Sequence, residues 1–261
     1  MKWYVLTDLE GPCRVNRWEQ TRSAELTPAK RDAMTLLTNE VNAVVDGLFD
    51  ADPAAQVVVW DGHGNGGLDL LALHPRAALI ARGAGIRAPY HLDAGFAGLL
   101  FVGQHAMAGT PQGTLAHTYS SQTVEFFQLN GHFIGEFGCR AVMAGALGVP
   151  TVFVAGDNLA CAEARALVPG IVTVDTKVCL GEELALHHPL AQVHAELRSR
   201  AALAVQRVRE IAPVVWPRPY TLRTRVLPGC GLAGYLARAG VRQLDERTVE
   251  ATADVPWELW I

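Results

Sequence analysis

The chain opens with MKWYVLTDLEGP (residues 1–12), in which an apolar run over residues 3–7 is followed by two acids, Asp8 and Glu10. Such a run is typical of a buried strand, and in a strand residues two apart point to the same side. Asp8 and Glu10 are therefore expected to project together from the strand's carboxyl end. Two like charges are costly to bury without a partner, so we expect a cation between them.

Strand-like and helix-like patterns alternate along the rest of the chain. Apolar runs predict further strands over 57–60, 98–102, 150–155 and 171–174, and helical spacing predicts helices over 28–49, 135–147 and 188–211. Thr27 and Pro28 have the residue types that begin a helix. The alternation predicts an α/β three-layer fold with a largely parallel central sheet, in which ligands bind beyond the carboxyl ends of the strands.

Two turn signals mark the remaining organisation. Asn130-Gly131 lies between short β-type runs and predicts a hairpin over 123–134. The WPRP sequence at 216–219 is a candidate boundary between an α/β domain, 1–215, and a small C-terminal α+β segment, 216–261. The last residues, VPWELWI, are too apolar for a free tail, so we expect this segment to pack on the body or on a neighbouring subunit.

Composition excludes several classes of function. The chain has 261 residues, 50% of them hydrophobic, a net charge of −4 and no long basic run, so neither nucleic-acid nor anionic-membrane binding is indicated. Its five cysteines are scattered and form no CxxC, which argues against a disulfide framework. No apolar stretch of signal-peptide or membrane-span length occurs. We therefore expect a cytoplasmic protein.

Polar side chains follow three of the predicted strands. Asp8 and Glu10 follow the first, His63 the second, and His105 the third. Oxygen and nitrogen donors without sulfur suit Zn²⁺, Mn²⁺ or Co²⁺. A set of this kind can hold two ions about 3.5–4 Å apart with a bridging carboxylate.

Several polar residues have two readings from the sequence alone. Asp61 and Asp157 are more often cap or turn residues than ligands, and His63 alone is ambiguous. His117, within GTLAHTYSS (113–121), is either a satisfied loop histidine or a catalytic acid or base. Lys177 suits a salt bridge as well as a substrate contact.

Five segments together resemble the zinc-dependent D-aminopeptidases of the dipeptide-transport operon family. They are TDLEG (7–11), DGHG (61–64), GQHAMAGT (103–110), AHTYSS (116–121) and LNGHFIGEFGCRAVMAGALGVPTVFVAGDN (129–158). They occur in the family's order and at similar intervals over nearly the whole chain.

The resemblance implies a dinuclear zinc aminopeptidase that removes D-residues, often D-Ala, from short peptides. It assigns the metal ligands to five residues, with Asp8 bridging the two ions, and gives His117 the catalytic role. It also implies assembly into a large homo-oligomeric ring. The implied ligands are Asp8, Glu10, His63, His105 and Glu136.

Three departures from the family pattern bear on the substrate more than on the metal site. Thr7 stands where the family has Ser, Pro12-Cys13-Arg14 replaces a small flexible stretch, and GNGG follows His63 in place of bulkier residues. Arg14 could alter substrate preference.

Two other functions stay open at this point. The same site would suit another metallohydrolase, such as an amidase, an L- or β-aminopeptidase or a phosphatase. A non-catalytic peptide- or metal-binding protein is the second alternative. In the catalytic readings the metal activates water and His117 moves a proton or stabilises the oxyanion.

Overall fold

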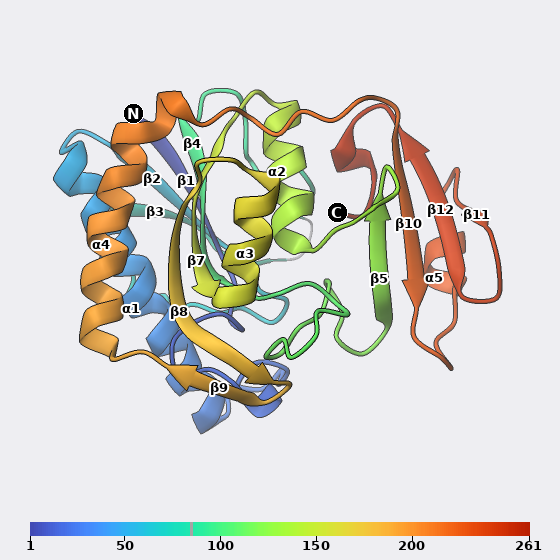
Figure 1. The fold of residues 1–261 in the computed structure, drawn as a ribbon, viewed down its shortest axis with the longest axis horizontal. Coiled ribbons are helices and arrows are strands. Elements are labelled where there is room, and N and C mark those ends of the chain that lie inside the picture. The colour runs from blue at the N-terminus through green and yellow to red at the C-terminus, as the bar shows by residue number, and fades with distance from the viewer. Residues whose placement is uncertain (84–85) are drawn as a thin grey trace.

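The computed structural model describes residues 1–83 and 86–261, and its largest element is a seven-stranded sheet in the order β3-β2-β1-β4-β7-β8-β9 (Figure 1). Neighbouring strands are parallel except β9, which runs antiparallel to β8. The strands are β1 (Lys2–Thr7), β2 (Gln56–Asp61), β3 (Ala77–Ile80), β4 (Gly98–Gln104), β7 (Thr151–Asp157), β8 (Val172–Gly181) and β9 (Leu184–His187).

Helices cover both faces of this sheet. As Figure 1 shows, α1 (Pro28–Ala51) and α4 (Leu190–Arg207) lie together on one side, and α2 (Glu136–Ala146) and α3 (Asn158–Leu167) on the other. The predicted three-layer α/β fold with a largely parallel sheet is confirmed. Among the described residues, no helix combines the length and apolar character needed to cross a membrane.

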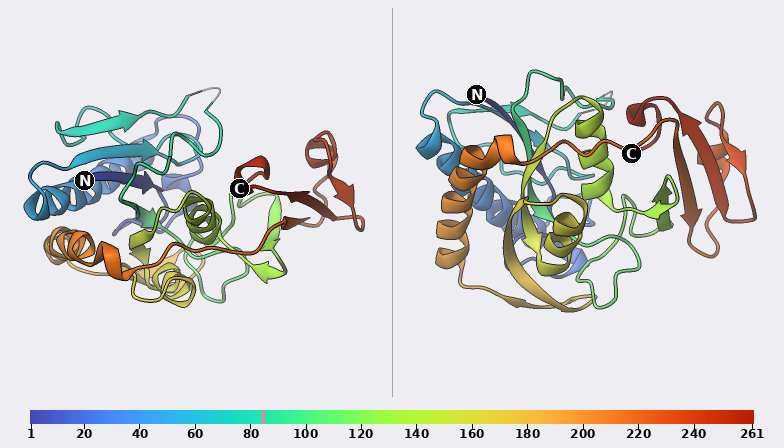
Figure 2. Two further views of the ribbon diagram at one scale, coloured as in Figure 1. Left: turned by 90° about the horizontal axis from the view of Figure 1, so that it is seen from above. Right: turned by 45° about the horizontal axis from the view of Figure 1, so that its top comes forward.

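A second, antiparallel sheet stands beside the first, in the order β11-β12-β10-β5-β6 (Figure 2). Its strands are β5 (Val124–Leu129), β6 (His132–Phe133), β10 (Tyr220–Val226), β11 (Arg242–Gln243) and β12 (Thr248–Ala253), with the short helix α5 (Ala233–Leu236) between β10 and β11. β5 pairs with β10, so this sheet draws strands from both sides of WPRP. The division into 1–215 and 216–261 stays a prediction.

Local signals placed several element ends correctly. Thr27 Oγ1 accepts a hydrogen bond from the Lys30 amide at 3.2 Å, and α1 begins at Pro28 as predicted. Asn130 and Gly131 have φ values of 50° and 83°, which is the left-handed pair that an Asn-Gly hairpin turn requires.

Other element bounds differ from the prediction. The strand predicted over 171–174 continues to Gly181 because it pairs with the unpredicted edge strand β9. The helix predicted to end at Ile211 ends at Arg207 and continues as a 3₁₀ turn, Val208–Glu210. The sequence did not predict β3 or α3. β3 is only four residues long, and α3 buries only small side chains, so neither gives a clear apolar pattern.

The ends of β1 and β4 are held unusually close. The amides of Asp8 and Gly11 donate to the carbonyls of Val102 and Gly103 at 2.9 and 2.7 Å. Gly103 has φ +85°, and a Cβ there would lie 2.0 Å from the Asp8 carbonyl oxygen. The sheet order reverses between these two strands, and this switch point is where open α/β sheets bind ligands.

Candidate metal centre

Three predicted ligands meet beyond the carboxyl ends of β1 and β2. Asp8, Glu10 and His63 are close enough for one ligand atom of each to lie within 4.8 Å of the others. His63 Nε2 is 3.4 Å from Glu10 Oε1. The parallel register explains the meeting, because Thr7 pairs with Asp61 and both strands end at the same edge.

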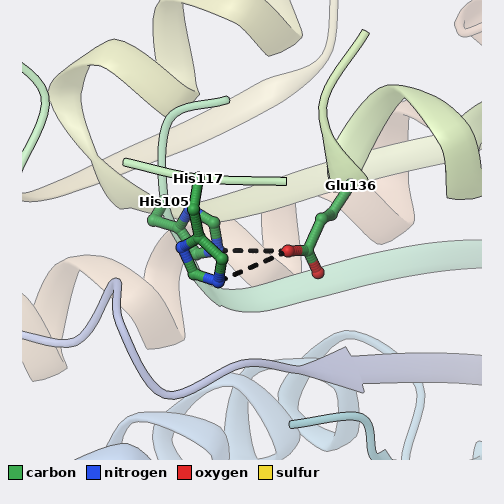
Figure 3. Close-up of side chains that lie close together, drawn as sticks. All are labelled: His105, His117 and Glu136. Carbon is green, nitrogen blue, oxygen red and sulfur yellow. Dashed lines mark ion pairs between the residues drawn. The ribbon is translucent and has the colours of Figure 1, made fainter. Parts of the chain in front are cut away.

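A second triad of donors consists of His105, His117 and Glu136, whose ligand atoms also lie within 4.8 Å of one another. His105 follows β4, His117 lies in the loop before β5, and Glu136 is the first residue of α2. Figure 3 shows both rings facing the Glu136 carboxylate, with Nε2 of His105 and His117 at 3.5 and 3.8 Å from its Oε1. The two rings stack at 4.1 Å with an interplanar angle of 6°.

The two triads touch each other through Asp8 and His105. Asp8 Oδ2 is 3.2 Å from His105 Nε2. The structure thus brings together all six residues that the sequence analysis selected, from β1, β2, β4, a loop and α2. Asp8, Glu10, His63, His117 and Glu136 line one cavity of about 1010 Å³.

The residues fit a bound cation. His105 Nδ1 lies 2.9 Å from the Ala106 carbonyl and must donate to it, which leaves the Nε2 lone pair free. That Nε2, together with Asp8 Oδ2 and Glu10 Oε2, is buried and has no hydrogen-bond partner in the described part of the chain. Buried lone pairs gathered in this way are stabilised by a metal ion, and a mixed histidine–carboxylate set suits zinc.

Electrostatics in the first triad are set by burial and mutual contact. Burial and the neighbouring Glu10 charge raise the pKa of Asp8 to about 7. Burial opposes ionisation of Glu10 as well, yet the His63 contact holds the pKa of Glu10 well below its usual range. Burial likewise opposes charging of His63, but the Glu10 carboxylate raises its pKa to about 9.

In the second triad, too, burial and the contacts between charged groups shift the pKa values in opposite directions. Burial disfavours the charged forms of Glu136 and His105, but their close contact lowers the pKa of Glu136 to about 2. The contacts with Asp8 and Glu136 raise the pKa of His105. Burial and the His105 charge lower the pKa of His117. Without a bound cation the centre therefore favours charge separation, with His117 as its neutral imidazole. A bound metal ion would take the place of the protons on His63 and His105.

The structure resolves the ambiguous residues named above. Asp157 caps α3 by accepting from the Leu159 and Ala160 amides, and its other oxygen accepts from the Ala106 amide. Asp61 accepts from the Gly67 amide at 2.8 Å, which is a turn contact.

Lys177 forms no salt bridge with a carboxylate in the part of the chain that the structure describes. Its buried Nζ donates to the backbone carbonyls of Glu10, Pro12 and Val15 and so holds the loop that carries Glu10. Arg14 is exposed and lies outside the residues that line the cavity.

Sequence reasoning did not select some residues that line the cavity. Arg140 lies one helical turn after Glu136, and the aromatic residues Trp60, Tyr90 and Tyr119 surround it. The spacing of Glu136 and Arg140 places both on one face of α2, which was a signal available in the sequence.

A doubly wound sheet with carboxylate and imidazole donors at its switch point defines an α/β metalloenzyme. A family model described as D-aminopeptidase matches residues 1–260, and the chain belongs to that family. The family and the class of enzyme expected from the sequence are thereby confirmed: the chain is a metal-dependent aminopeptidase.

Two relatives agree with this membership. A D-aminopeptidase of Bacillus subtilis (strain 168) is 32% identical over 222 residues, which cover 83% of this chain and 78% of that protein. The solved structure described as "Zn-dependent D-aminopeptidase DppA from Bacillus subtilis, a self-compartmentalizing protease" superposes with a TM-score of 0.91 at 28% identity. That match covers 99% of this chain and 93% of the other.

Proposed function

We propose that this protein is a dinuclear zinc D-aminopeptidase that removes the N-terminal D-residue from short peptides. The observation that carries the proposal is the pair of donor triads joined by the contact between Asp8 and His105. The Bacillus relative is described as a Zn-dependent D-aminopeptidase, and this description supports the choice of metal and substrate.

Five of the six residues are assigned as ligands: Asp8, Glu10, His63, His105 and Glu136. Asp8 is the proposed bridging ligand, because it lies within reach of both triads. When bound, the two zinc ions supply Lewis-acid activation of the scissile carbonyl and of the attacking water.

His117 is assigned to proton transfer or to stabilising the oxyanion. Its Nδ1 lies 2.9 Å from the Leu115 carbonyl and must donate to it, so Nε2 carries the free lone pair. The same Nε2 is 3.8 Å from Glu136 Oε1, which places it beside the ligands. A neutral imidazole held in one tautomer is suited to accept a proton near neutral pH.

A homo-oligomeric assembly is part of the proposal. The relative's description as self-compartmentalizing supports it. Large exposed apolar side chains on the hairpin of β8 and β9 also support it, since Leu184 and Leu186 are 58% and 60% exposed in the single chain. Light scattering on purified protein would measure the assembled mass.

The test is elemental analysis of the purified protein together with hydrolysis of D-Ala, L-Ala and β-Ala amides. We expect two zinc ions per chain and turnover restricted to the D-Ala amide. Preferential turnover of the L- or β-Ala amide would reassign the enzyme to another specificity. Bound zinc without turnover of any amide would instead indicate a binding protein.

A further inference from the structure

Arg140 places a cation in the cavity that also holds the carboxylates of the candidate metal centre. It follows Glu136 by four residues on α2, so both side chains leave the same helix face. Arg140, Glu136, Asp8 and Glu10 all line this cavity. The cavity therefore has an acidic, metal-binding part and a separate guanidinium.

Aromatic rings fix the position of this guanidinium. Its central carbon is 4.2 Å from the centroid of the Tyr90 ring and 5.3 Å from those of Trp60 and Tyr119. The Trp60 and Tyr90 rings stack on each other at 4.2 Å, so they form a rigid wall. Cation–π contacts hold an arginine in place while leaving its N–H donors available in the ring plane.

Those donors lack an anionic partner. Within the part of the chain that the structure describes, no carboxylate forms an ion pair with Arg140, and its buried Nη1 has no hydrogen-bond partner. The nearby Tyr119 hydroxyl is also buried without a partner. Two other buried cations among the described residues, Lys30 and Lys177, donate to backbone carbonyls, so the lack of partners at Arg140 is not a general feature of this core.

We propose that Arg140, assisted by the Tyr119 hydroxyl, binds the C-terminal carboxylate of the substrate. The preferred substrates are then short peptides with a free carboxyl end. This inference rests on the proposed function and adds the substrate class to it. A guanidinium and a phenol are the donors that commonly bind a carboxylate, and a short peptide carries its amine and its carboxylate at opposite ends.

The experiment compares two substrates that differ only at the carboxyl end, D-Ala-D-Ala and its C-terminal amide. For the wild type we expect a lower KM for the acid. In Arg140→Met, KM for the acid should rise about 10–100-fold, the size of a lost charged hydrogen bond. KM for the amide and the zinc content should stay close to wild type.

Matched variants separate recognition from structure and from general charge. Tyr119→Phe should raise KM for the acid selectively, but by less than Arg140→Met does. Arg140→Lys should retain part of the preference for the acid that Arg140→Met loses. Arg87→Met removes an exposed cation that lines the same cavity, and it should leave the acid-to-amide ratio unchanged.

Several results would overturn the inference. One is an equal rise in KM for the acid and the amide in Arg140→Met. That result is expected if a buried water in one of the two small cavities that border Arg140 accepts a hydrogen bond from Nη1. A second is an equal effect of Arg87→Met, which would make the preference a matter of net charge.

Failure of the proposed function can be told apart from failure of this inference. If the wild type cleaves neither peptide, the proposed function falls, and calorimetric binding of D-Ala-D-Ala then decides the role of Arg140. Weaker binding of the acid but not of the amide by Arg140→Met would still support it. Identical binding by wild type and variant would refute it.

Discussion

His105 and His117 are stacked imidazoles with different proposed duties. Each ring donates Nδ1–H to a backbone carbonyl, so each offers Nε2 to the centre. They differ in their carboxylate neighbours, since His105 lies within 4 Å of both Asp8 and Glu136, whereas His117 lies that close only to Glu136 among the carboxylates that the structure describes. His105, which contacts two carboxylates, is the proposed ligand.

Substituting each histidine by alanine separates the two duties. His105→Ala should lose zinc and activity together, and excess zinc should restore part of the turnover. His117→Ala should keep its zinc while kcat falls by about 10²–10⁴-fold, the usual contribution of a general acid or base. Zinc per chain and kcat are measured for both variants.

The opposite pattern would contradict this division. A His117→Ala protein without zinc would make His117 a ligand, which its place within the second triad allows. Full zinc and full turnover would return it to the reading of a satisfied loop histidine.

At the scale of elements, the close approach of the ends of β1 and β4 depends on Gly103. Because a Cβ there would meet the Asp8 carbonyl at 2.0 Å, Gly103→Ala should lower the free energy of unfolding by about 1–3 kcal/mol and weaken zinc binding. Gly131→Ala is the matched control, with φ +83° and no heavy atom within 4 Å of the added Cβ. Urea unfolding of both variants measures the difference, and equal losses would show that the close contact has no effect.

Helix α1 carries a buried carboxyl outside the metal centre. Glu40 accepts from the Cys13 amide at 2.7 Å, while its second oxygen has no hydrogen-bond partner among the described residues. Burial raises the pKa of Glu40 from 4.5 to about 8. The folded state therefore holds a proton that the unfolded state releases, and stability is lost as pH rises from 4.5 to 8.

Glu40→Gln should remove this pH dependence, because glutamine stays neutral and its carbonyl can accept the same bond. Relative to the variant, the wild type should lose stability steadily across that interval. Urea unfolding at several pH values measures the difference between the two proteins. A difference that is constant with pH would mean that Glu40 does not change protonation on unfolding.

Local signals in the sequence determined what could be predicted about the elements. Thr27-Pro28 and Asn130-Gly131 act through their own backbone preferences, so the start of α1 and the β5–β6 turn were predictable. α3 was missed because its buried residues, Ala160, Cys161 and Ala164, are too small to give a clear apolar period.

In the candidate site, too, the residues whose positions follow from local sequence signals were predictable, and those placed by tertiary packing were not. Asp8, Glu10, His63 and His105 follow strands, and parallel strands must end at one edge, so their meeting followed from the pattern alone. Glu136 came only from the family resemblance, since it enters from α2 and its approach depends on tertiary packing. The spacing of Arg140 from Glu136 is visible in the sequence, but the place of Arg140 and Tyr119 in the cavity depends on the same packing.

At the scale of the whole molecule, the segment 257–261 joins the second sheet to the cavity. Leu259 and Ile261 are buried, and Trp260 Nε1 donates to Thr224 Oγ1 on β10 at 2.8 Å. Trp257 and Trp260 also line the cavity.

Deleting residues 257–261 should lower the melting temperature, because it exposes apolar surface on β10 and α2. Differential scanning calorimetry measures the change, and light scattering on the same samples reports the assembled mass. An unchanged melting temperature with an unchanged mass would show that the segment is energetically neutral.

The pairing of β5 with β10 has a consequence for synthesis on the ribosome. All six donor residues of the metal centre lie at or before position 136, whereas β10 and β12 are translated long afterwards. A nascent chain that has emerged only as far as α4 carries the complete donor set but lacks the partner strand of β5. A chain still attached to its ribosome at that stage would therefore lack the part of the cavity wall that Tyr235, Arg238, Trp257 and Trp260 form.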